Sequence, residues 1–260
     1  MRDLEKVRTV GRVAIKQVRP LIMAGFDRRL TISYKNEMDL VTEIDLASER
    51  GIVSVIEESF PEDGILGEEG GEVRSGSECR WVIDPLDGTT NFAHHFPFFC
   101  ISIGFEENGV LRYGIIHDPI REQTFEAEKG KGATLNGEPI LVSKTPRLSD
   151  ALLCTGFAAA RRDDPQRNNM PFFDRFWKKC HGIRRTGSAA LDLCYVATGA
   201  LDGFWELGLS PWDTAAGSLI VRESGGIVTD RDGSPHSLKS ACIVASNGLI
   251  HGEMVSTLAL

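Results

Sequence analysis

The sequence predicts an α/β protein of the α+β type, with helices packed on a largely antiparallel sheet in its first half and an α/β layer arrangement in its second. Three observations carry this prediction. The 260-residue chain is 42% hydrophobic and 25% charged, which is ordinary for a globular protein. Short strand patterns cluster within residues 64–128. Beyond residue 146, strand and helix patterns alternate more evenly.

Two amphipathic helices are expected at the start of the chain. Apolar residues recur at helical spacing over residues 4–21, which predicts the first helix. The second helix is expected over residues 42–59, and Pro61 stops it because proline cannot continue a helix interior. The residues expected on the inner side of the second helix are Leu46, Val53 and Ile56.

The remaining elements follow from short apolar runs and turn residues. Asn108-Gly109, between two such runs, is a strong hairpin signal. Strands are expected over residues 64–67, 81–83, 100–106, 110–117, 123–128, 151–157, 201–207, 227–229 and 241–245. Helices are expected over residues 169–180, 188–198 and 214–224. Loops around 130–146 predict a division into an N-terminal half, 1–145, and a C-terminal half, 146–260.

Charge and cysteine usage narrow the function. A net charge of -8 disfavours general nucleic-acid binding, and a phosphorylated substrate would need cations at its site. The six cysteines form no C-x-x-C pair, so buried free thiols are expected rather than a zinc site. The first residues do not resemble a signal peptide, and no apolar stretch approaches the roughly 20 residues that span a bilayer. We therefore expect a cytoplasmic protein without a membrane partner.

The sharpest signal is the run Asp84-Pro85-Leu86-Asp87-Gly88-Thr89-Thr90, directly after an apolar strand. Proline favours an abrupt turn that exposes both carboxylates and the Leu86 carbonyl together. Gly88 lets the backbone approach a ligand, and the threonines can open a helix. Neighbouring carboxylates repel each other unless a cation lies between them, and hard oxygen ligands suit Mg²⁺. An ordinary capped turn explains one aspartate but not the whole run.

Further acids fit a divided metal site. Glu68-Glu69 ends a strand, while Asp39, Asp45 and Asp213 lie beside helix starts. Taken singly, each is more often a helix cap or a solvated charge. Together with the Asp84 run, they predict a metal centre.

The type of phosphatase follows from motifs that the sequence lacks. Asp84 and Asp87 are three residues apart, unlike the alternating aspartates of phospho-aspartate enzymes. No G-x-S-x-G elbow or Walker-type phosphate loop occurs. Water activated by a metal ion is therefore the expected nucleophile.

These residues together resemble the inositol monophosphatase family, within the lithium-sensitive sugar-phosphatase superfamily. The segments that carry the resemblance are 81–92, 212–217, 39–45 and Glu68-Glu69, and residues 184–193 resemble its bacterial SuhB-like branch. The resemblance implies a layered αβαβα fold with the site between the two halves, and it implies a homodimer.

The resemblance also implies roles for matching positions. The metal ligands would be Glu68, Asp84, the Leu86 carbonyl, Asp87 and Asp213, and they would hold two or three Mg²⁺ ions. The catalytic residues would be Asp45, Thr89 and Glu68, with Asp45 and Thr89 orienting the attacking water. The substrate-binding residues would be Asp87, Gly88, Thr89, Ala189, Glu206 and Asp213. Lys35 is expected near this site, whereas His94 and His95 are expected at its entrance or on a dimer surface.

The expected activity is hydrolysis of myo-inositol monophosphate, a small phosphorylated polyol. Fructose 1,6-bisphosphate, histidinol phosphate and 3′-phosphoadenosine 5′-phosphate are the alternative substrates. A second phosphate would need a basic patch, for which Arg161-Arg162, Arg167 and Arg184-Arg185 are candidates, although most such arginines are surface charges. An alternative function is a binding role in transcription and ribosomal RNA processing.

Overall fold

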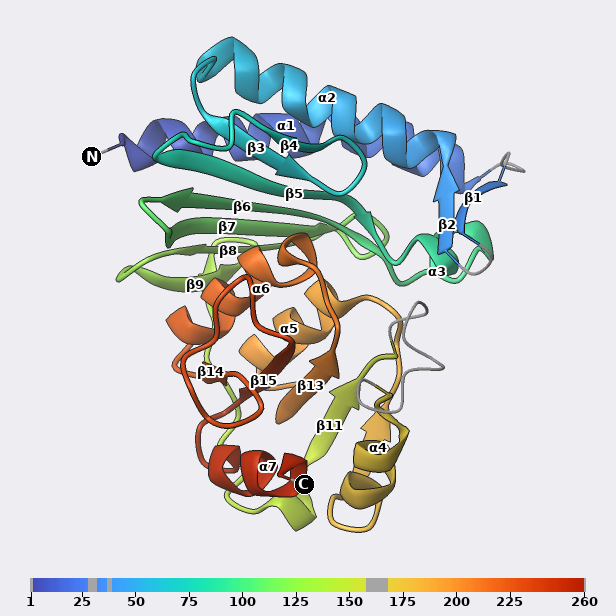
Figure 1. Cartoon of the computed structure of the whole chain (residues 1–260), viewed down its shortest axis with the longest axis vertical. Coiled ribbons are helices and arrows are strands. Elements are labelled where there is room, and N and C mark those ends of the chain that lie inside the picture. The colour runs from blue at the N-terminus through green and yellow to red at the C-terminus, as the bar shows by residue number, and fades with distance from the viewer. Residues whose placement is uncertain (1, 28–31, 37–38, 158–167, 260) are drawn as a thin grey trace.

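The computed structural model describes residues 2–27, 32–36, 39–157 and 168–259. Its helices and sheets stack in five alternating layers, with the first two helices at one end and the C-terminal helix at the other (Figure 1). This arrangement is the αβαβα fold implied by the resemblance.

The first layer is a pair of helices, α1 (Leu4–Phe26) and α2 (Glu43–Ser59). A short antiparallel ribbon that the sequence did not predict, β1 (Ile32–Asn36) and β2 (Asp39–Thr42), leads into α2. Thr42 caps α2, and Asp45 completes a capping box with it. The prediction for Leu46 was wrong, because this side chain is 41% exposed. The buried face of α2 instead carries Ile44, Ser48, Ile52, Val55 and Ile56.

The second layer is an eight-stranded sheet with the order β10-β9-β8-β7-β6-β5-β3-β4. Its strands are β3 (Gly64–Gly67), β4 (Gly71–Val73), β5 (Cys79–Asp87), β6 (Cys100–Glu107), β7 (Val110–Asp118), β8 (Gln123–Glu128), β9 (Gly132–Leu135) and β10 (Glu138–Pro139). Only β3 and β5 pair in parallel within this described sheet. The hairpin signal is confirmed, since Asn108 and Gly109 both have positive φ angles, 51° and 73°, between β6 and β7.

The third layer holds α5 (Ala189–Ala197) and α6 (Pro211–Glu223), which lie between the two sheets (Figure 1). Helix α6 approaches the large sheet so closely that two strand positions admit only glycine. A Cβ on Gly104 would lie 2.9 Å from the Ala215 Cβ, and one on Gly114 would lie 2.9 Å from the Ala216 Cα. This close packing holds the first turn of α6 against the end of β5.

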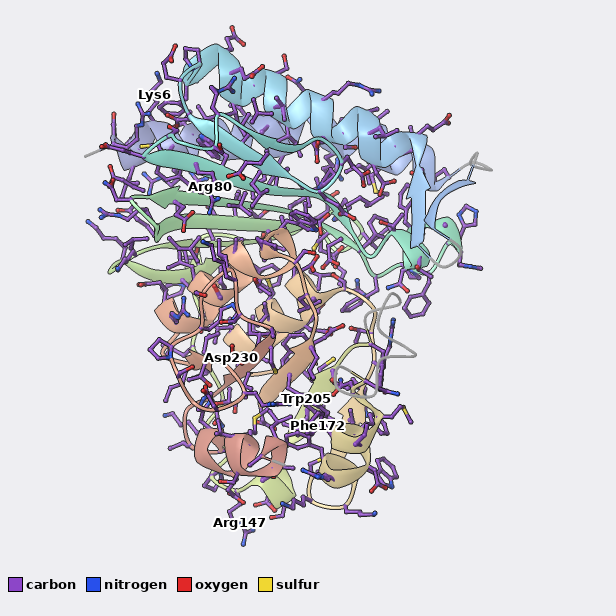
Figure 2. The ribbon with its side chains drawn as sticks, viewed as in Figure 1. Lys6, Arg80, Arg147, Phe172, Trp205 and Asp230 are labelled. Carbon is purple, nitrogen blue, oxygen red and sulfur yellow. The ribbon has the colours of Figure 1, made fainter. Side chains whose placement is uncertain are left out.

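The fourth layer is a five-stranded sheet with the order β12-β11-β13-β15-β14. Its strands are β11 (Leu152–Thr155), β12 (Gly182–Arg184), β13 (Gly203–Leu207), β14 (Ile227–Thr229) and β15 (Cys242–Ser246). The outer layer holds α4 (Met170–Trp177), α7 (His251–Leu258) and a short 3-10 helix, Leu148–Asp150. Trp205 of β13 stacks on Phe176 of α4 with ring centroids 4.0 Å apart, and Figure 2 shows Trp205 beside Phe172 in this outer core.

Most long elements agree with the sequence patterns to within a few residues. The sequence did not predict β4, β9, β10, β12 or α7, each of which is short. All six cysteines are free thiols, as expected. None of the helices in the described ranges is long and apolar enough to cross a membrane. The division at residues 145 and 146 stays a prediction, because α5 and α6 pack against both sheets.

Candidate active site

Three carboxylates meet where β5 ends beside α6. Each of Asp84, Asp87 and Asp213 offers an oxygen, and these oxygens all lie within 4.8 Å of one another. Side chains alternate along a regular strand, so residues three apart would face opposite sides. The pairing of β5 with β6 shifts register between Asp84 and Asp87, around Pro85, which has no N–H to donate. The bulge therefore turns both carboxylates toward the same point.

Each of these carboxylates is held by backbone groups. Leu86 N–H donates to Asp84 Oδ1 at 3.0 Å, and Ser210 N–H donates to Asp213 Oδ2 at 2.6 Å in the capping box of α6. Asp87 Oδ2 accepts from Ser188 Oγ at 2.6 Å and from Ala190 N–H at 2.8 Å. Ser188 and Ala190 begin α5, so the C-terminal half fixes a carboxylate of the N-terminal half. Neither residue was predicted to have this role.

Glu68 follows β3 and is tied to its neighbour strand, since its N–H donates to Ile83 O at 3.2 Å. A buried residue that the sequence analysis missed, Glu49 of α2, clamps the same turn. Its carboxylate accepts from Glu69 N–H at 2.9 Å and from Gly70 N–H at 2.6 Å. A Cβ on Gly70 would lie 2.7 Å from Glu49 Oε1, so glycine leaves room for this contact. The available signal was that Glu49 follows Asp45 by one helical turn.

Asp45, Thr89 and the Leu86 carbonyl form a second group beside the cluster. Thr89 Oγ1 lies 3.0 Å from Asp45 Oδ1 and 3.1 Å from Leu86 O. The hydroxyl has one proton, so it donates to one of these acceptors at a time. Asp45 Oδ2 accepts from Thr42 N–H at 3.0 Å, which fixes the carboxylate. When Thr89 donates to Asp45, the Leu86 carbonyl is free to bind a cation.

Burial and mutual repulsion shift the pKa values of these acids. Burial, with the charges of Glu68, Asp87 and Asp213, raises the pKa of Asp84 well above its usual range. Burial raises the pKa of Asp87 to about 6, opposed by the hydrogen bonds from Ser188 and Ala190. Burial also raises the pKa of Asp45, although its bonds to Thr42 lower it. Ionised carboxylates this close and this buried require a compensating cation.

A cavity of about 100 Å³ adjoins the cluster and reaches into the C-terminal half. Its lining includes Asp87, Ala189, Glu206 and Asp213, which were all predicted to contact substrate. Glu206 is buried, and its pKa is raised by burial and by the neighbouring Asp192 and Asp213. Arg185, a candidate for binding a second phosphate, also lines the cavity, together with residues that were not predicted to do so, among them Gly156 and Asp192.

The structure thus brings together all of the predicted ligand, catalytic and substrate residues. Gly88, with a φ of 95°, joins β5 to α3 (Thr89–Ala93) between Asp87 and Thr89. The predictions for Lys35, Asp39 and the Arg161-Arg162 and Arg167 patch concern side chains outside the described residues. His95 Nδ1 donates to the Phe26 carbonyl at 2.8 Å, and no catalytic role is assigned to it.

A five-layered αβαβα fold with a buried carboxylate cluster between its sheets defines a phosphoric monoester hydrolase whose acids suit a metal ion. The chain belongs to the inositol monophosphatase family, whose model matches residues 3–259.

Named relatives agree with this assignment. An inositol-1-monophosphatase from Synechocystis sp. is 47% identical over 222 residues, covering 85% of this chain and 77% of that protein. Nus factor SuhB from Pseudomonas aeruginosa is 40% identical over 259 residues, covering 98% and 93%. The structure of an inositol monophosphatase from Anabaena superposes with a TM-score of 0.90 at 41% identity, covering 98% of this chain and 96% of that one.

Proposed function

We propose that this phosphatase is a Mg²⁺-dependent enzyme that hydrolyses myo-inositol monophosphate to inositol and phosphate. The observation that carries the proposal is the group of three carboxylate oxygens within 4.8 Å of one another, beside the paired Asp45 and Thr89. A relative named inositol-1-monophosphatase, 47% identical, supports the choice of substrate.

The donor set fits Mg²⁺, which prefers carboxylate and carbonyl oxygens and tolerates several waters. The residues that would hold two or three ions are Glu68, Asp84, the Leu86 carbonyl, Asp87 and Asp213. When bound, the ions would neutralise phosphate charge, lower the pKa of water and stabilise the leaving oxygen.

Asp45 and Thr89 would orient the attacking water. With its own proton donated to Asp45 Oδ1, Thr89 Oγ1 keeps lone pairs that accept a hydrogen bond from water. The proton released by that water would pass through Thr89 Oγ1 to Asp45, whose carboxylate is buried and hydrogen-bonded to Thr42. Glu68, whose charge acts on Asp84, would assist by holding a metal ion.

Phosphate and polyol would be held by different parts of the chain. In α3 the Phe92 N–H donates to Gly88 O at 3.0 Å, so Gly88 lies at the start of this helix. The first N–H groups of a helix have no acceptor within it, so those of Gly88 and Thr89 would be available to phosphate oxygens. The polyol hydroxyls would contact Glu206, the backbone at Ala189 and the carboxylates of Asp87 and Asp213 in the adjoining cavity. An acid that binds hydroxyls selects a polyol over an apolar alcohol.

The test is phosphate release from inositol 1-phosphate, fructose 1,6-bisphosphate, histidinol phosphate and 3′-phosphoadenosine 5′-phosphate. Each substrate is assayed with Mg²⁺, with chelator and with added Li⁺. Asp84→Asn should abolish turnover, whereas the matched control Asp174→Asn, an exposed residue on α4, should not. Fastest Mg²⁺-dependent turnover of inositol 1-phosphate supports the proposal. Faster turnover of another substrate, or turnover in chelator, contradicts it.

A binding role in transcription is a second candidate, favoured by the 40% identity to a protein named Nus factor SuhB over 98% of this chain. Pull-down of transcription components by the doubly substituted Asp84→Asn, Asp213→Asn protein would establish a role that is independent of catalysis. Absence of binding by the unsubstituted protein would remove this candidate.

We also propose that the chain forms a homodimer in the cytoplasm. Light scattering during size-exclusion chromatography would test the assembly, and a mass equal to one 28.5 kDa chain would contradict it.

A further inference from the structure

A second cavity lies away from the carboxylate cluster, between the large sheet, α6 and the segment 235–239. Its volume is about 960 Å³, near the upper end of the roughly 300–1,000 Å³ found for small-molecule sites. Arg222 in the last turn of α6 lines it, whereas Asp213 lies in the first turn of the same helix. Nine helical residues separate the two by about 14 Å along the axis. Arg222 is therefore remote from the carboxylate cluster, and the two cavities share no lining residue, whereas Leu66 and Pro211 of this lining lie two residues before Glu68 and Asp213.

Arg222 is a half-buried cation without an opposite charge. Arg222 Nη2 donates to the His236 carbonyl at 3.2 Å, and no carboxylate of the described residues forms an ion pair with this guanidinium. Burial lowers the pKa of Arg222, with no neighbouring acid to raise it. The remaining N–H groups of a guanidinium held in this way are available to an acceptor in the cavity.

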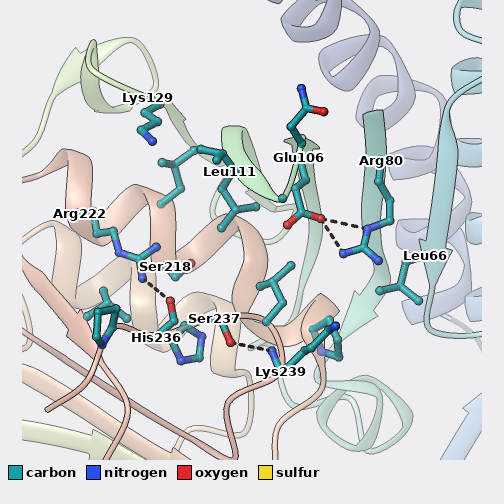
Figure 3. A pocket seen from close by; sticks show the side chains of 18 of the residues that line it. Leu66, Arg80, Glu106, Leu111, Lys129, Ser218, Arg222, His236, Ser237 and Lys239 are labelled. Carbon is teal, nitrogen blue, oxygen red and sulfur yellow. Dashed lines mark hydrogen bonds and ion pairs between the residues drawn. The ribbon is translucent and has the colours of Figure 1, made fainter. Parts of the chain in front are cut away.

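Two lysines add positive charge to the same cavity. Lys129 and Lys239 line it, and neither is paired with a carboxylate within the described ranges. Figure 3 shows Lys129 and Arg222 together on one side, with Arg80 and Glu106 on the opposite side.

Most of the acids that line the cavity are already occupied. Arg80 Nη2 lies 2.6 Å from Glu106 Oε2, and Arg80 Nη1 lies 3.1 Å from Glu72 Oε1. The oxygens of Glu223 accept from Gly130 N–H at 2.9 Å and from Gly132 N–H at 3.0 Å. Glu78, near Ser75 and Ser77 in the chain, is the remaining acid of the lining. Bonds from neutral N–H groups leave the charge of Glu223 in place, so the lining carries four acids and four cations, but within the described ranges none of these acids forms an ion pair with Arg222 or Lys129.

An apolar surface adjoins the cations. Leu111, Leu219 and Val228 line the same cavity, from β7, α6 and β14. Cations beside an apolar wall suit a ligand with an anionic group on an apolar body. We propose that this cavity binds a small phosphorylated molecule, with its phosphate on Arg222 and Lys129 and its apolar part on these three side chains.

The test measures binding of inorganic phosphate and of phenyl phosphate by calorimetry in the presence of chelator. Without metal, the carboxylates of the active site repel anions, so binding under these conditions reports the second cavity. Phenyl phosphate should bind about tenfold more tightly than inorganic phosphate, because its ring is buried against the apolar wall. Asp84→Asn should leave both affinities unchanged.

Arg222→Gln and Lys129→Gln should each weaken binding about tenfold. The matched control is Arg147→Gln. Arg147 is an exposed arginine, and Figure 2 shows it far from Arg80, which lines the cavity. Lys129 is exposed, so Lys129→Gln should fold normally and still tests the proposal if Arg222→Gln does not fold. The proposal is overturned by an absence of saturable binding, by full binding in both variants, or by an equal loss in Arg147→Gln.

Discussion

Glu49→Gln tests whether α2 positions the metal site through the turn that follows β3. The Glu49 carboxylate is 6% exposed and accepts two backbone N–H groups, from Glu69 at 2.9 Å and from Gly70 at 2.6 Å. Because α2 also carries Asp45, this contact joins the acid that we propose orients water to the turn that carries Glu68. The substitution keeps the size of the side chain but leaves only one acceptor oxygen.

The expected loss of stability follows from the two hydrogen bonds that Glu49 accepts. A hydrogen bond to a charged group contributes roughly 1.5–3 kcal/mol, and glutamine would lose one of the two and weaken the other. We expect the free energy of unfolding to fall by about 2 kcal/mol. Residues that orient metal ligands typically change metal affinity by about 10–100-fold, so Mg²⁺ binding should weaken by about tenfold.

Urea unfolding and calorimetric Mg²⁺ titration measure the two effects separately. Glu58→Gln is the matched control, since Glu58 is an exposed residue of the same helix and should change stability by less than about 0.5 kcal/mol. A Glu49→Gln protein with the stability and Mg²⁺ affinity of the Glu58→Gln control would refute the positioning argument. A loss of stability with unchanged Mg²⁺ affinity would limit Glu49 to a structural role.

Three further predictions concern repulsion between carboxylates, the pH dependence of stability and a steric clash in the substrate cavity. Asp84→Asn should stabilise the metal-free protein by about 1 kcal/mol, by relieving repulsion, and should remove stabilisation by Mg²⁺; thermal unfolding in chelator and in Mg²⁺ checks both. The pKa of His236 is lowered to about 4, chiefly by burial, so the neutral ring is favoured and stability is lost as pH falls from 6.5 toward 4. The loss at pH 5 relative to pH 8 should be about 2 kcal/mol, and urea unfolding should show it reduced in His236→Gln. Gly156→Ala should displace Glu206, because the added Cβ would lie 2.0 Å from Oε2, and should raise KM for inositol 1-phosphate about tenfold with a smaller change in kcat. Gly182→Ala, whose Cβ meets nothing closer than 3.5 Å, is the kinetic control.

Features that depend on a few neighbouring residues could be predicted from the sequence. The hairpin at Asn108-Gly109 and the helix starts near Thr42 and Ser188 follow from local conformational preferences and local hydrogen bonds. The run from Asp84 to Thr90 could be identified because its two aspartates, its proline and its glycine directly follow an apolar strand pattern. The resemblance to a known family then supplied roles for Glu68, Glu206 and Asp213, which periodicity alone does not connect.

Contacts between distant segments were decided only by the tertiary structure. Periodicity placed Leu46 inside, but the large sheet covers the face of α2 that carries Ile44 and Ile52. Ser188 and Ala190, which donate to Asp87, are 101 and 103 residues away from it in the sequence. Glu49 and Gly70, which are also hydrogen-bonded, are 21 residues apart. Such pairs depend on how whole layers pack, because a side chain's partner is set by the path of the chain rather than by its neighbours in sequence.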